Sequence, residues 1–250
     1  MTLRLGDHPP EDRGVAAPSP SLVPVRRSFF QHNVLDVAPS LLGMVLRRRD
    51  PEGTVALRIT EVEAYGGGQD PGSHAFRGPT PRNRTMFGPP GHLYCYFTYG
   101  MHHAMNVVVG ESGQAAACLF RAGEIVEGGA LARRRRECQP RTTPLLERAL
   151  ARGPGCVAQC FGVDRDNDGD DLLAGAWEIL VTPARAVGAY HSGPRVGVSG
   201  AGGRADFPWR FWLGGEPSVS AYRPGRVSVA TRATAAPPAL KVGLDLETHL

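Results

Sequence analysis

The stretch TVALRITEVEAY, residues 54–65, alternates as a β-strand does, and Gly66 ends the pattern. Side chains of a strand point alternately to its two faces, so Glu61, Glu63 and Tyr65 share one face. Two carboxylates beside an aromatic ring are unusual in a protein interior, whereas most glutamates on strands are simply exposed. The pattern therefore leaves two interpretations open: a solvated face, or a site where one of the carboxylates works.

The elements on either side of this strand predict a mixed α/β chain of the α+β class. Residues 34–47 carry apolar side chains at the spacing of an amphipathic helix that passes into a strand. Residues 66–91 are punctuated by Gly and Pro and predict a long surface loop, and loops of that length are usually functional. Further strands are expected at about residues 93–98, 105–109, 115–121, 177–181 and 195–198, and helices at about residues 127–137 and 143–152.

Composition divides the 250 residues into three parts. Residues 1–25 are rich in Pro and charge and lack periodicity, which is typical of a disordered arm. A folded unit is expected over residues 26–228, and one domain is the default for this length. The Ala, Thr and Pro content of residues 229–250 indicates a flexible tail.

The net charge of +4 is carried almost entirely by arginine, because Lys241 is the only lysine. Arginine grips phosphate oxygens with two hydrogen bonds and stacks on bases, so this balance favours a nucleic-acid partner. High genomic G+C content would also replace lysine by arginine. Composition alone is therefore a weak indication of the partner.

Cysteine usage and hydropathy predict a cytoplasmic protein, associated with the nucleoid if the source is bacterial. The five cysteines are an odd number without a CxxC pair, which fits reduced thiols better than a disulfide framework. No positively charged start precedes an apolar stretch, and no apolar run approaches about 18 residues. Neither secretion nor membrane spanning is expected.

Four of the six tyrosines, Tyr65, Tyr94, Tyr96 and Tyr99, lie close together in the sequence, with His74 between the first two. Aromatic residues make up only 7% of the chain, so the clustering is not a general richness in aromatics. Tyr94 and Tyr96 share a face of their predicted strand by alternation. The cluster indicates a pocket that stacks a flat ring, with the carboxylates beside it.

Two charged runs have an ordinary structural explanation as well as a functional one. Residues 164–169, DRDNDG, match the opening of a calcium-binding loop, but Gly175 stands where the bidentate glutamate is needed. A solvated turn is therefore expected there. Residues 133–136, four consecutive arginines, are either a nucleic-acid patch or a solvated helix face, and the sequence does not separate these alternatives.

The pattern of histidine and cysteine predicts no metal and no cofactor. His102 and His103 beside Cys95 or Cys118 do not have the spacing of a zinc site. The HxE and PCxxC signature of zinc deaminases is also absent, so a nucleobase deaminase is disfavoured.

Several spaced motifs, in order, closely resemble the alkyladenine (3-methyladenine) DNA glycosylase family over residues from about 41 to 210. They are residues 61–65 (EVEAY), 70–74 (DPGSH), 80–87 (TPRNRTMF), 91–101 (GHLYCYFTYGM), Asn106, 119–122 (LFRA), 153–155 (GPG), 195–198 (RVGV) and 208–211 (PWRF). The resemblance implies one domain built on a curved, mostly antiparallel sheet with surrounding helices. It also implies a protruding β-hairpin that carries Tyr99 toward DNA.

The resemblance assigns roles to the residues of the aromatic cluster. It implies that Glu63 activates the water that attacks the sugar C1′, and that Arg121 helps to place that water or the carboxylate. Tyr65, His74 and Tyr96 would line the slot that holds a base extruded from the duplex.

The same resemblance implies contacts at the floor and rim of that slot. Asn106 would sit at the floor and crowd the exocyclic amino group of a normal guanine. Tyr99 would push into the minor groove and fill the gap left by the departed nucleotide. Arg82 and Met86 are expected to contact the DNA, and Arg82 would meet a phosphate.

Together these features predict a monofunctional DNA glycosylase of base excision repair that acts on double-stranded DNA as a monomer. Its substrates would be alkylated or deaminated purines: 3-methyladenine, 7-methylguanine, ethenoadenine and hypoxanthine. Strand cleavage through a Schiff base needs an uncharged amine near the sugar, and Lys241 lies in the predicted tail, so no lyase activity is expected. The alternative is a non-catalytic reader that flips and marks alkylated bases, which would have no use for Glu63.

Overall fold

The fold is known from a computed structural model that describes residues 21–98, 100–138, 143–183, 188–225 and 240–241. The helices in these residues are α1 (Val34–Ser40), α2 (Gly129–Arg136) and α3 (Pro154–Phe161). Short 3-10 turns are η1 (Arg27–Gln31), η2 (Gly67–Gln69), η3 (Arg84–Phe87), η4 (Glu147–Ala149), η5 (Arg165–Asn167) and η6 (Ala201–Gly203). The strands are β1 (Val23–Pro24), β2 (Val45–Asp50), β3 (Gly53–Tyr65), β4 (Leu93–Thr98), β5 (His102–Val108), β6 (Ala117–Glu127), β7 (Ala151–Arg152), β8 (Trp177–Val181), β9 (Tyr190–Gly193), β10 (Arg210–Leu213) and β11 (Leu240–Lys241).

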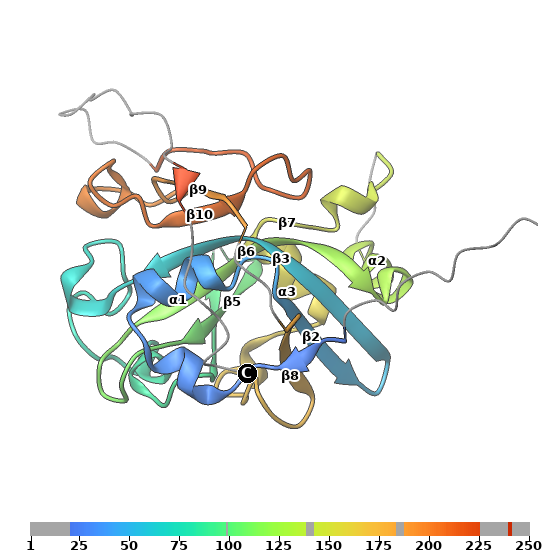
Figure 1. Ribbon diagram of the computed structural model, residues 1–250, viewed down its shortest axis with the longest axis horizontal. Helices are drawn as coiled ribbons and strands as arrows, with labels where there is room; N and C mark the ends of the chain where they lie inside the picture. The colour runs from blue at the N-terminus through green and yellow to red at the C-terminus, as the bar shows by residue number, and fades with distance from the viewer. Residues whose placement is uncertain (1–20, 99, 139–142, 184–187, 226–239, 242–250) are drawn as a thin grey trace, which may run out of the picture.

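The strands form one open sheet, and every strand pairing among the described residues is antiparallel (Figure 1). Its main path runs β1-β8-β2-β3-β10-β9-β11, and β6 pairs with β3, β5 and β7. The long strand β3 therefore has β6 along one edge and β2 and then β10 along the other. This arrangement confirms the predicted α+β class with a mostly antiparallel sheet.

The second half of β3 is bent where it carries the two glutamates. The register between β3 and β6 shifts between Ile59 and Glu61 and again between Glu61 and Val62, as at a β-bulge. Here β3 is paired on both edges, because Glu61 to Glu63 also pair with β10. Both glutamates are consequently buried, which excludes the solvated face that the sequence left open.

The helices close the core around this sheet. Helix α1 packs against β3 and β6, and α3 packs against β5, β6 and α2. Asn33 caps α1, accepting a hydrogen bond from the Leu35 amide at 2.9 Å, and Gly162 ends α3 in the left-handed conformation with φ 63°. Phe161 at the end of α3 meets Trp177 of β8 with ring centroids 5.5 Å apart, and both side chains are buried.

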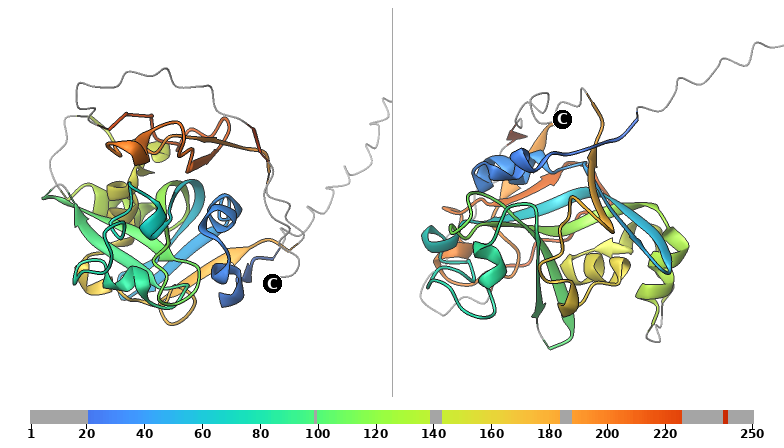
Figure 2. Two further views of the ribbon diagram at one scale, coloured as in Figure 1. Left: turned by 90° about the vertical axis from the view of Figure 1, so that its left-hand side faces the viewer. Right: turned by 90° about the horizontal axis from the view of Figure 1, so that it is seen from below.

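Strands β4 and β5 form a hairpin that extends from the body of the molecule (Figure 2). Thr98 pairs with His102 at its end, and Tyr94 pairs with Asn106 further in. The expected hairpin is therefore present. Tyr99, for which we predicted insertion into DNA, lies outside the described residues.

Two local expectations are wrong, and one helix was not expected. The helix expected at residues 143–152 is instead turn η4 followed by β7, because Ala151 and Arg152 pair with Gly123 and Ala122 of β6. The strand expected at residues 195–198 is a turn, and the nearby strands are β9 and β10. Helix α3 was not predicted. Its start, Gly153-Pro154-Gly155, has the Gly and Pro residues that are typical of a loop. Pro is nevertheless well tolerated in the first turn of a helix.

The described residues begin and end within the predicted arm and tail. Val23 and Pro24 pair with β8, three residues before the expected start at Arg26, and Val25 is buried. Strand β11 pairs with β9. Residues 1–20, 226–239 and 242–250 lie outside the described residues. Within the described part of the chain, no helix is long and apolar enough to cross a membrane.

Candidate active site

Side chains from β3, β4, β5 and β6 line a cavity of about 290 Å³. The segment before η3, the turn after β9 and Pro154 at the start of α3 close its remaining sides. The cavity brings together six of the predicted site residues: Glu63, Tyr65, His74, Tyr96, Asn106 and Arg121. The other lining residues are Pro71, Gly72, Tyr94, Thr98, Ala104, Leu119, Pro154, Val196, Gly197, Val198 and Ser199.

A larger hollow of about 670 Å³ lies elsewhere, bordered by the start of α1, turn η2, Phe76, Gln114 and Trp209. None of its lining residues is Asp, Glu, Lys or Arg. The smaller cavity holds both a carboxylate and a guanidinium, so it is the one equipped for acid-base chemistry.

Glu63 is held in place by two hydrogen-bond donors and one ion pair. Its side chain is 1% exposed, and Oε1 accepts a hydrogen bond of 2.7 Å from the Val196 amide. Oε2 accepts a hydrogen bond of 2.9 Å from the Tyr65 hydroxyl, and Nε of Arg121 lies 3.5 Å from Oε1. A buried carboxylate needs such donors to offset its lost hydration. Two carboxylate oxygens offer about four lone-pair sites, so Glu63 keeps room for a further donor in the cavity.

Glu61 has a different environment from Glu63, although the two share a strand face. It is 0% exposed and does not line the cavity. Its carboxylate accepts hydrogen bonds from Arg210 Nε at 2.6 Å and from the Ser220 amide at 2.7 Å, and Arg121 Nε lies 3.1 Å away. Arg121 Nε also donates to Ser220 Oγ at 3.2 Å. Glu61 therefore anchors Arg121 from behind, while Glu63 faces the cavity.

Three neighbouring rings, those of His74, Tyr94 and Tyr96, form an aromatic wall of the cavity. The His74 and Tyr96 rings meet edge to face with centroids 4.6 Å apart, and Tyr94 and Tyr96 are tilted with centroids 5.3 Å apart. His74 Nδ1 and the Tyr94 hydroxyl share a hydrogen bond of 3.1 Å. Burial raises the pKa of Tyr94 to about 12, so this phenol stays protonated at neutral pH.

Tyr65 and His74 are also kept uncharged by their surroundings. Burial, and next the charge of Glu63, raise the pKa of Tyr65 well above its ordinary value. Partial withdrawal from water, and next the charge of Arg82, lower the pKa of His74. At neutral pH the rings of Tyr65, His74 and Tyr94 are therefore uncharged.

Polar contacts behind the wall fix the loop that carries His74 and the strand that carries the tyrosines. The Asn83 side chain donates to the carbonyls of His74, at 2.9 Å, and Gly78, at 3.1 Å. Asn106 Nδ2 donates to the Tyr94 carbonyl at 2.9 Å, and Asn106 is itself only 3% exposed. The side chains that line the cavity are thus held by hydrogen bonds outside it.

The residues predicted to touch DNA lie in different places. Arg82 is exposed, with Cζ 5.7 Å from the centroid of Tyr96, and it donates to the Phe97 carbonyl at 3.1 Å. Met86 is only 2% exposed and packs in a small apolar cluster with Ala75 and Tyr94. Its side chain therefore packs against Tyr94 in the interior, and its contact with DNA stays a prediction.

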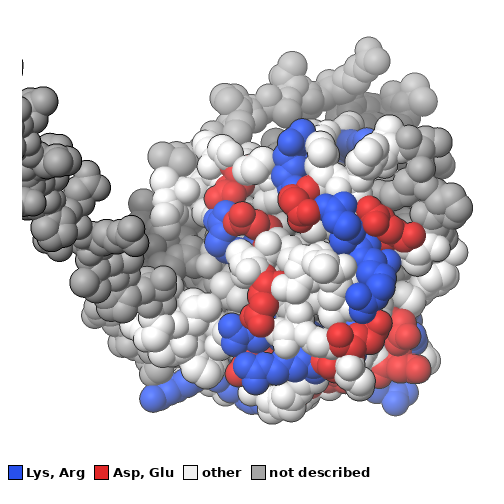
Figure 3. All heavy atoms as spheres, turned by 90° about the vertical axis from the view of Figure 1, so that its right-hand side faces the viewer, with Lys and Arg blue, Asp and Glu red and all other residues white. Residues whose placement is uncertain are grey.

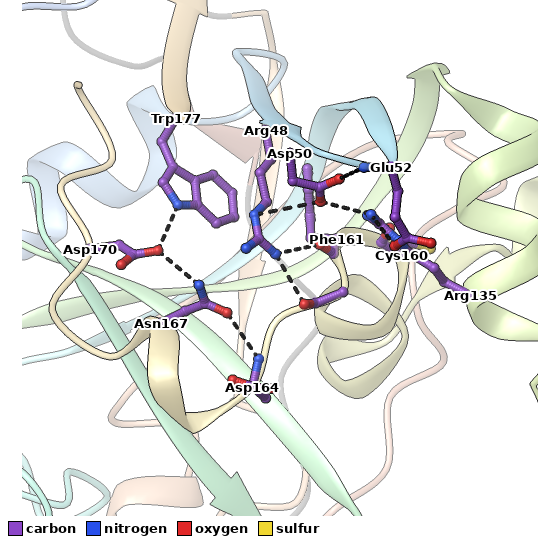
Figure 4. Close-up of polar contacts among 11 residues, drawn as sticks. Arg48, Asp50, Glu52, Arg135, Cys160, Phe161, Asp164, Asn167, Asp170 and Trp177 are labelled. Atoms are coloured by element: carbon purple, nitrogen blue, oxygen red, sulfur yellow. Dashed lines mark hydrogen bonds and ion pairs between the residues drawn. The ribbon is translucent and has the colours of Figure 1, made fainter. Parts of the chain in front are cut away.

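The aspartate-rich turn at residues 164–170 is held by internal hydrogen bonds (Figure 4). Asp170 accepts from Asn167 Nδ2 and from Trp177 Nε1, each at 3.0 Å. Asp168 accepts from the Cys95 amide at 2.9 Å and from Thr85 Oγ1 at 3.0 Å, which braces β4 between its two tyrosines. No group of His, Cys, Asp or Glu in the described ranges is arranged to hold a metal.

The arginine run on α2 is compensated by carboxylates. Figure 3 shows basic and acidic side chains interleaved on this side of the molecule. Arg133 is paired with Glu137 and Glu147, Arg135 with Asp50 and Glu52, and Arg134 with Glu52. Arg136 is buried and donates to the Leu150 carbonyl at 2.8 Å. Of the two alternatives, the run is better explained as a structural, ion-paired helix face than as a nucleic-acid patch.

Sequence reasoning missed the residues that reach the site through their backbone or from distant segments. The Val196 amide gives no signal in the sequence, although the motif RVGV around it had been noted. Ser220 gives no signal either, and for Arg210, which lies in the motif PWRF, the contact with Glu61 is known only from the folded chain.

Comparisons with known proteins converge on one family. The family described as Methylpurine-DNA glycosylase (MPG) matches residues 28–217 of this chain. A protein of Leifsonia xyli subsp. xyli is 57% identical over 199 residues, which cover 79% of this chain and 92% of the relative. A protein of Streptomyces avermitilis is 51% identical over 208 residues, or 82% and 94% of the two chains. A protein of Frankia casuarinae is 44% identical over 221 residues, or 84% and 98%. Each of these relatives is named "Putative 3-methyladenine DNA glycosylase".

Proposed function

This chain belongs to the methylpurine-DNA glycosylase family, and on that premise we propose that it is a monofunctional enzyme with Glu63 as its catalytic base. It would flip alkylated or deaminated purines out of duplex DNA and hydrolyse the N-glycosidic bond, leaving an abasic site. One observation carries the proposal: the buried carboxylate of Glu63 and a wall of neutral aromatic rings line the same cavity.

The cavity suits one extruded base. A glycosidic bond inside a duplex is hidden, so the nucleotide must rotate out at a cost of a few kcal/mol in stacking and pairing. Stacking of a base on an aromatic ring is worth about 1 to 3 kcal/mol, which Tyr65 and Tyr96 would supply. Ligand pockets usually measure roughly 300 to 1,000 Å³, and this cavity of about 290 Å³ lies just below the lower end of that range.

Glu63 is the carboxylate best placed to act on the sugar. Cleavage of a glycosidic bond passes through an oxocarbenium-like sugar, which an ionised carboxylate stabilises while it also deprotonates the attacking water. Glu61 is sealed behind Arg121 and has no access to the cavity. We assign to Arg121 the role of fixing the orientation of Glu63 and of the attacking water.

The neutral rings also favour damaged purines over normal ones. Alkylation at N3 or N7 makes a purine cationic, and an aromatic face attracts a cation by about 0.5 to 2 kcal/mol. Ethenoadenine and hypoxanthine are neutral and would rely on stacking alone. Asn106, which is buried at the cavity, would crowd the exocyclic amino group of guanine.

Residues at the rim of the cavity would contact the DNA. Arg82, exposed beside Tyr96, would meet a phosphate, and Tyr99 would fill the gap in the duplex.

Lyase activity is not expected, because Lys241 is the only lysine and Schiff-base formation needs an amine near the sugar. We propose that the enzyme acts as a monomer in the cytoplasm.

The test compares wild type with Glu63→Gln on duplexes that contain 7-methylguanine, hypoxanthine or ethenoadenine. We expect base release by wild type, at least a hundredfold less by the variant, and retained duplex binding by both; general-base contributions are about 10²- to 10⁴-fold. Glu124→Gln is the matched control, since Glu124 lies on β6, is half exposed and pairs with Arg58. Equal release by wild type and Glu63→Gln would dismiss Glu63 as the base. Binding of damaged DNA without release by wild type would favour the non-catalytic reader.

A further inference from the structure

Arg195 and Asp70 form a wholly buried ion pair next to the cavity. Both side chains are 0% exposed, and each Nη atom of Arg195 donates to one carboxylate oxygen of Asp70. The same nitrogens donate to the carbonyls of Ala64, at 2.9 Å, and Gly202, at 2.8 Å. Replacing a buried ion pair by apolar residues is often neutral or stabilising, so stability alone is a poor reason for this one.

The guanidinium of Arg195 lies over one face of the Tyr65 ring. Its Cζ is 4.6 Å from the centroid of Tyr65 and 5.3 Å from that of Trp209. Tyr65 lines the cavity, whereas Arg195 does not. The cation therefore covers the side of the ring that is turned away from the cavity.

The close packing around Arg195 leaves it little freedom to move. Gly72, which lines the cavity, has no side chain at this point, and a Cβ there would lie 2.5 Å from Arg195 Nη2. The next peptide along the chain is fixed as well, because the Val196 amide donates to Glu63 at 2.7 Å. The pair is thus built into the same framework as the proposed catalytic base.

A cation on one face of an aromatic ring makes the opposite face less attractive to a second cation. The attraction of a ring for cations comes from the negative potential of its π faces. A guanidinium beneath Tyr65 lowers that potential on the face offered to a base, and Asp70 partly offsets the effect. A cationic purine such as 7-methylguanine loses attraction there, whereas a neutral base such as hypoxanthine keeps its stacking contact.

We propose that the Arg195–Asp70 pair is a specificity-determining element. It lowers the attraction for cations of the Tyr65 face that is offered to a base. Neutral lesions therefore compete better with cationic ones than they would if Tyr65 had no cation on its other face. Arg195 acts through Tyr65 and not by touching the substrate, so it is a positioning and tuning residue. The inference rests on the proposed glycosylase function and on stacking of the base against Tyr65.

The experiment measures the ratio of single-turnover release rates from duplexes with 7-methylguanine and with hypoxanthine. In the double variant Arg195→Met/Asp70→Asn both charges are removed, so we expect the ratio to rise about threefold to tenfold. In Asp70→Asn alone the cation loses its counter-charge, so we expect the ratio to fall by about threefold. Both substrates are assayed with the same preparation, so the ratio does not depend on the fraction of folded enzyme.

Arg48→Met is the matched control. Arg48 also lies over an aromatic ring, with Cζ 5.2 Å from the centroid of Trp177, and it is paired with Asp50 (Figure 4). Neither Arg48 nor Trp177 lines the cavity. This variant loses a comparable cation–ring contact, so its ratio should equal that of wild type.

Opposite shifts in the two Arg195–Asp70 variants, with no shift in Arg48→Met, would establish the proposal, because loss of stability cannot change the ratio in both directions. Equal losses on both substrates in either variant, including complete loss, would overturn it and leave the pair a structural role. Absence of release by wild type would count against the proposed function itself.

Discussion

The hydroxyl of Tyr65 donates a 2.9 Å hydrogen bond to Oε2 of Glu63, the carboxylate two residues earlier on the same strand. One side chain thus contributes both an aromatic surface in the cavity and a donor that orients the proposed base. The relationship is possible because residues two apart on a strand point to the same face.

Tyr65→Phe separates these two contributions. The variant keeps the ring but removes the donor to Glu63. A hydrogen bond to a charged group is worth about 1.5 to 3 kcal/mol, so we expect single-turnover base release to fall roughly tenfold to a hundredfold. Duplex binding, measured by fluorescence anisotropy, should change less than twofold. A larger loss in binding than in release would contradict the orienting role of the hydroxyl.

Tyr94 makes the fold sensitive to alkaline pH. Burial raises the pKa of Tyr94 to about 12 in the fold, whereas an unfolded phenol ionises near pH 10. Between these values the unfolded chain loses its proton first, so the free energy of unfolding falls as the pH rises, by about 2 to 3 kcal/mol for this group. Urea unfolding of wild type and Tyr94→Phe between pH 8 and pH 11.5 tests this. The stability difference between the two proteins should shrink as the pH rises, and a constant difference would contradict the prediction.

The ionisation of His74 has the opposite effect on stability: it destabilises the fold as the pH falls, not as it rises. Partial withdrawal from water and the nearby charge of Arg82 lower its pKa in the fold, so below pH 6.5 the unfolded chain takes up a proton first. Its contribution therefore destabilises the fold as the pH falls from about 6.5 through the lowered pKa. An NMR titration of the His74 ring should give a pKa below that of a histidine in a short peptide. In Arg82→Ala this pKa should rise toward the peptide value, because the second cause has been removed.

Gly72→Ala tests the packing against the buried guanidinium. The added Cβ would lie 2.5 Å from Arg195 Nη2 and 2.8 Å from a methyl of Val198, so neighbouring atoms must shift. Overpacking of this kind costs about 1 to 3 kcal/mol, which should appear as a lower urea midpoint. Gly68→Ala is the control, because nothing lies within 4 Å of its added Cβ and a change within about 0.5 kcal/mol is expected. Equal stability of the two variants would contradict the close packing.

Much of the fold could be predicted from local pattern. Strands β3, β4 and β8 lie where alternation predicted them, and α1 and α2 follow their apolar and charged patterns. The failures have a common cause. Residues 143–152 have helical spacing, but Ala151 and Arg152 pair with β6, and that pairing depends on a strand about 30 residues away.

The candidate site, like the fold, could be predicted only in part from local sequence. The clustering of Tyr65, His74, Tyr94 and Tyr96 was visible in the sequence, and the fold brings all four to one cavity. The burial of Met86 could not be predicted, because a methionine in a loop gives no sign of the direction in which it points. Packing of Met86 beneath Tyr94 is a property of the folded cluster.

The amino-acid order alone places Glu61, Glu63 and Tyr65 on one face of a strand, since alternation is a local property of extended backbone. Only the folded chain distinguishes the two glutamates. Glu61 is sealed by Ser220, 159 residues further on, whereas Glu63 is held by the Val196 amide, 133 residues further on, and stays open to the cavity. Burial and electrostatic environment are set by whichever distant segments pack against a side chain, so which of two equivalent carboxylates faces the cavity is a property of the tertiary structure.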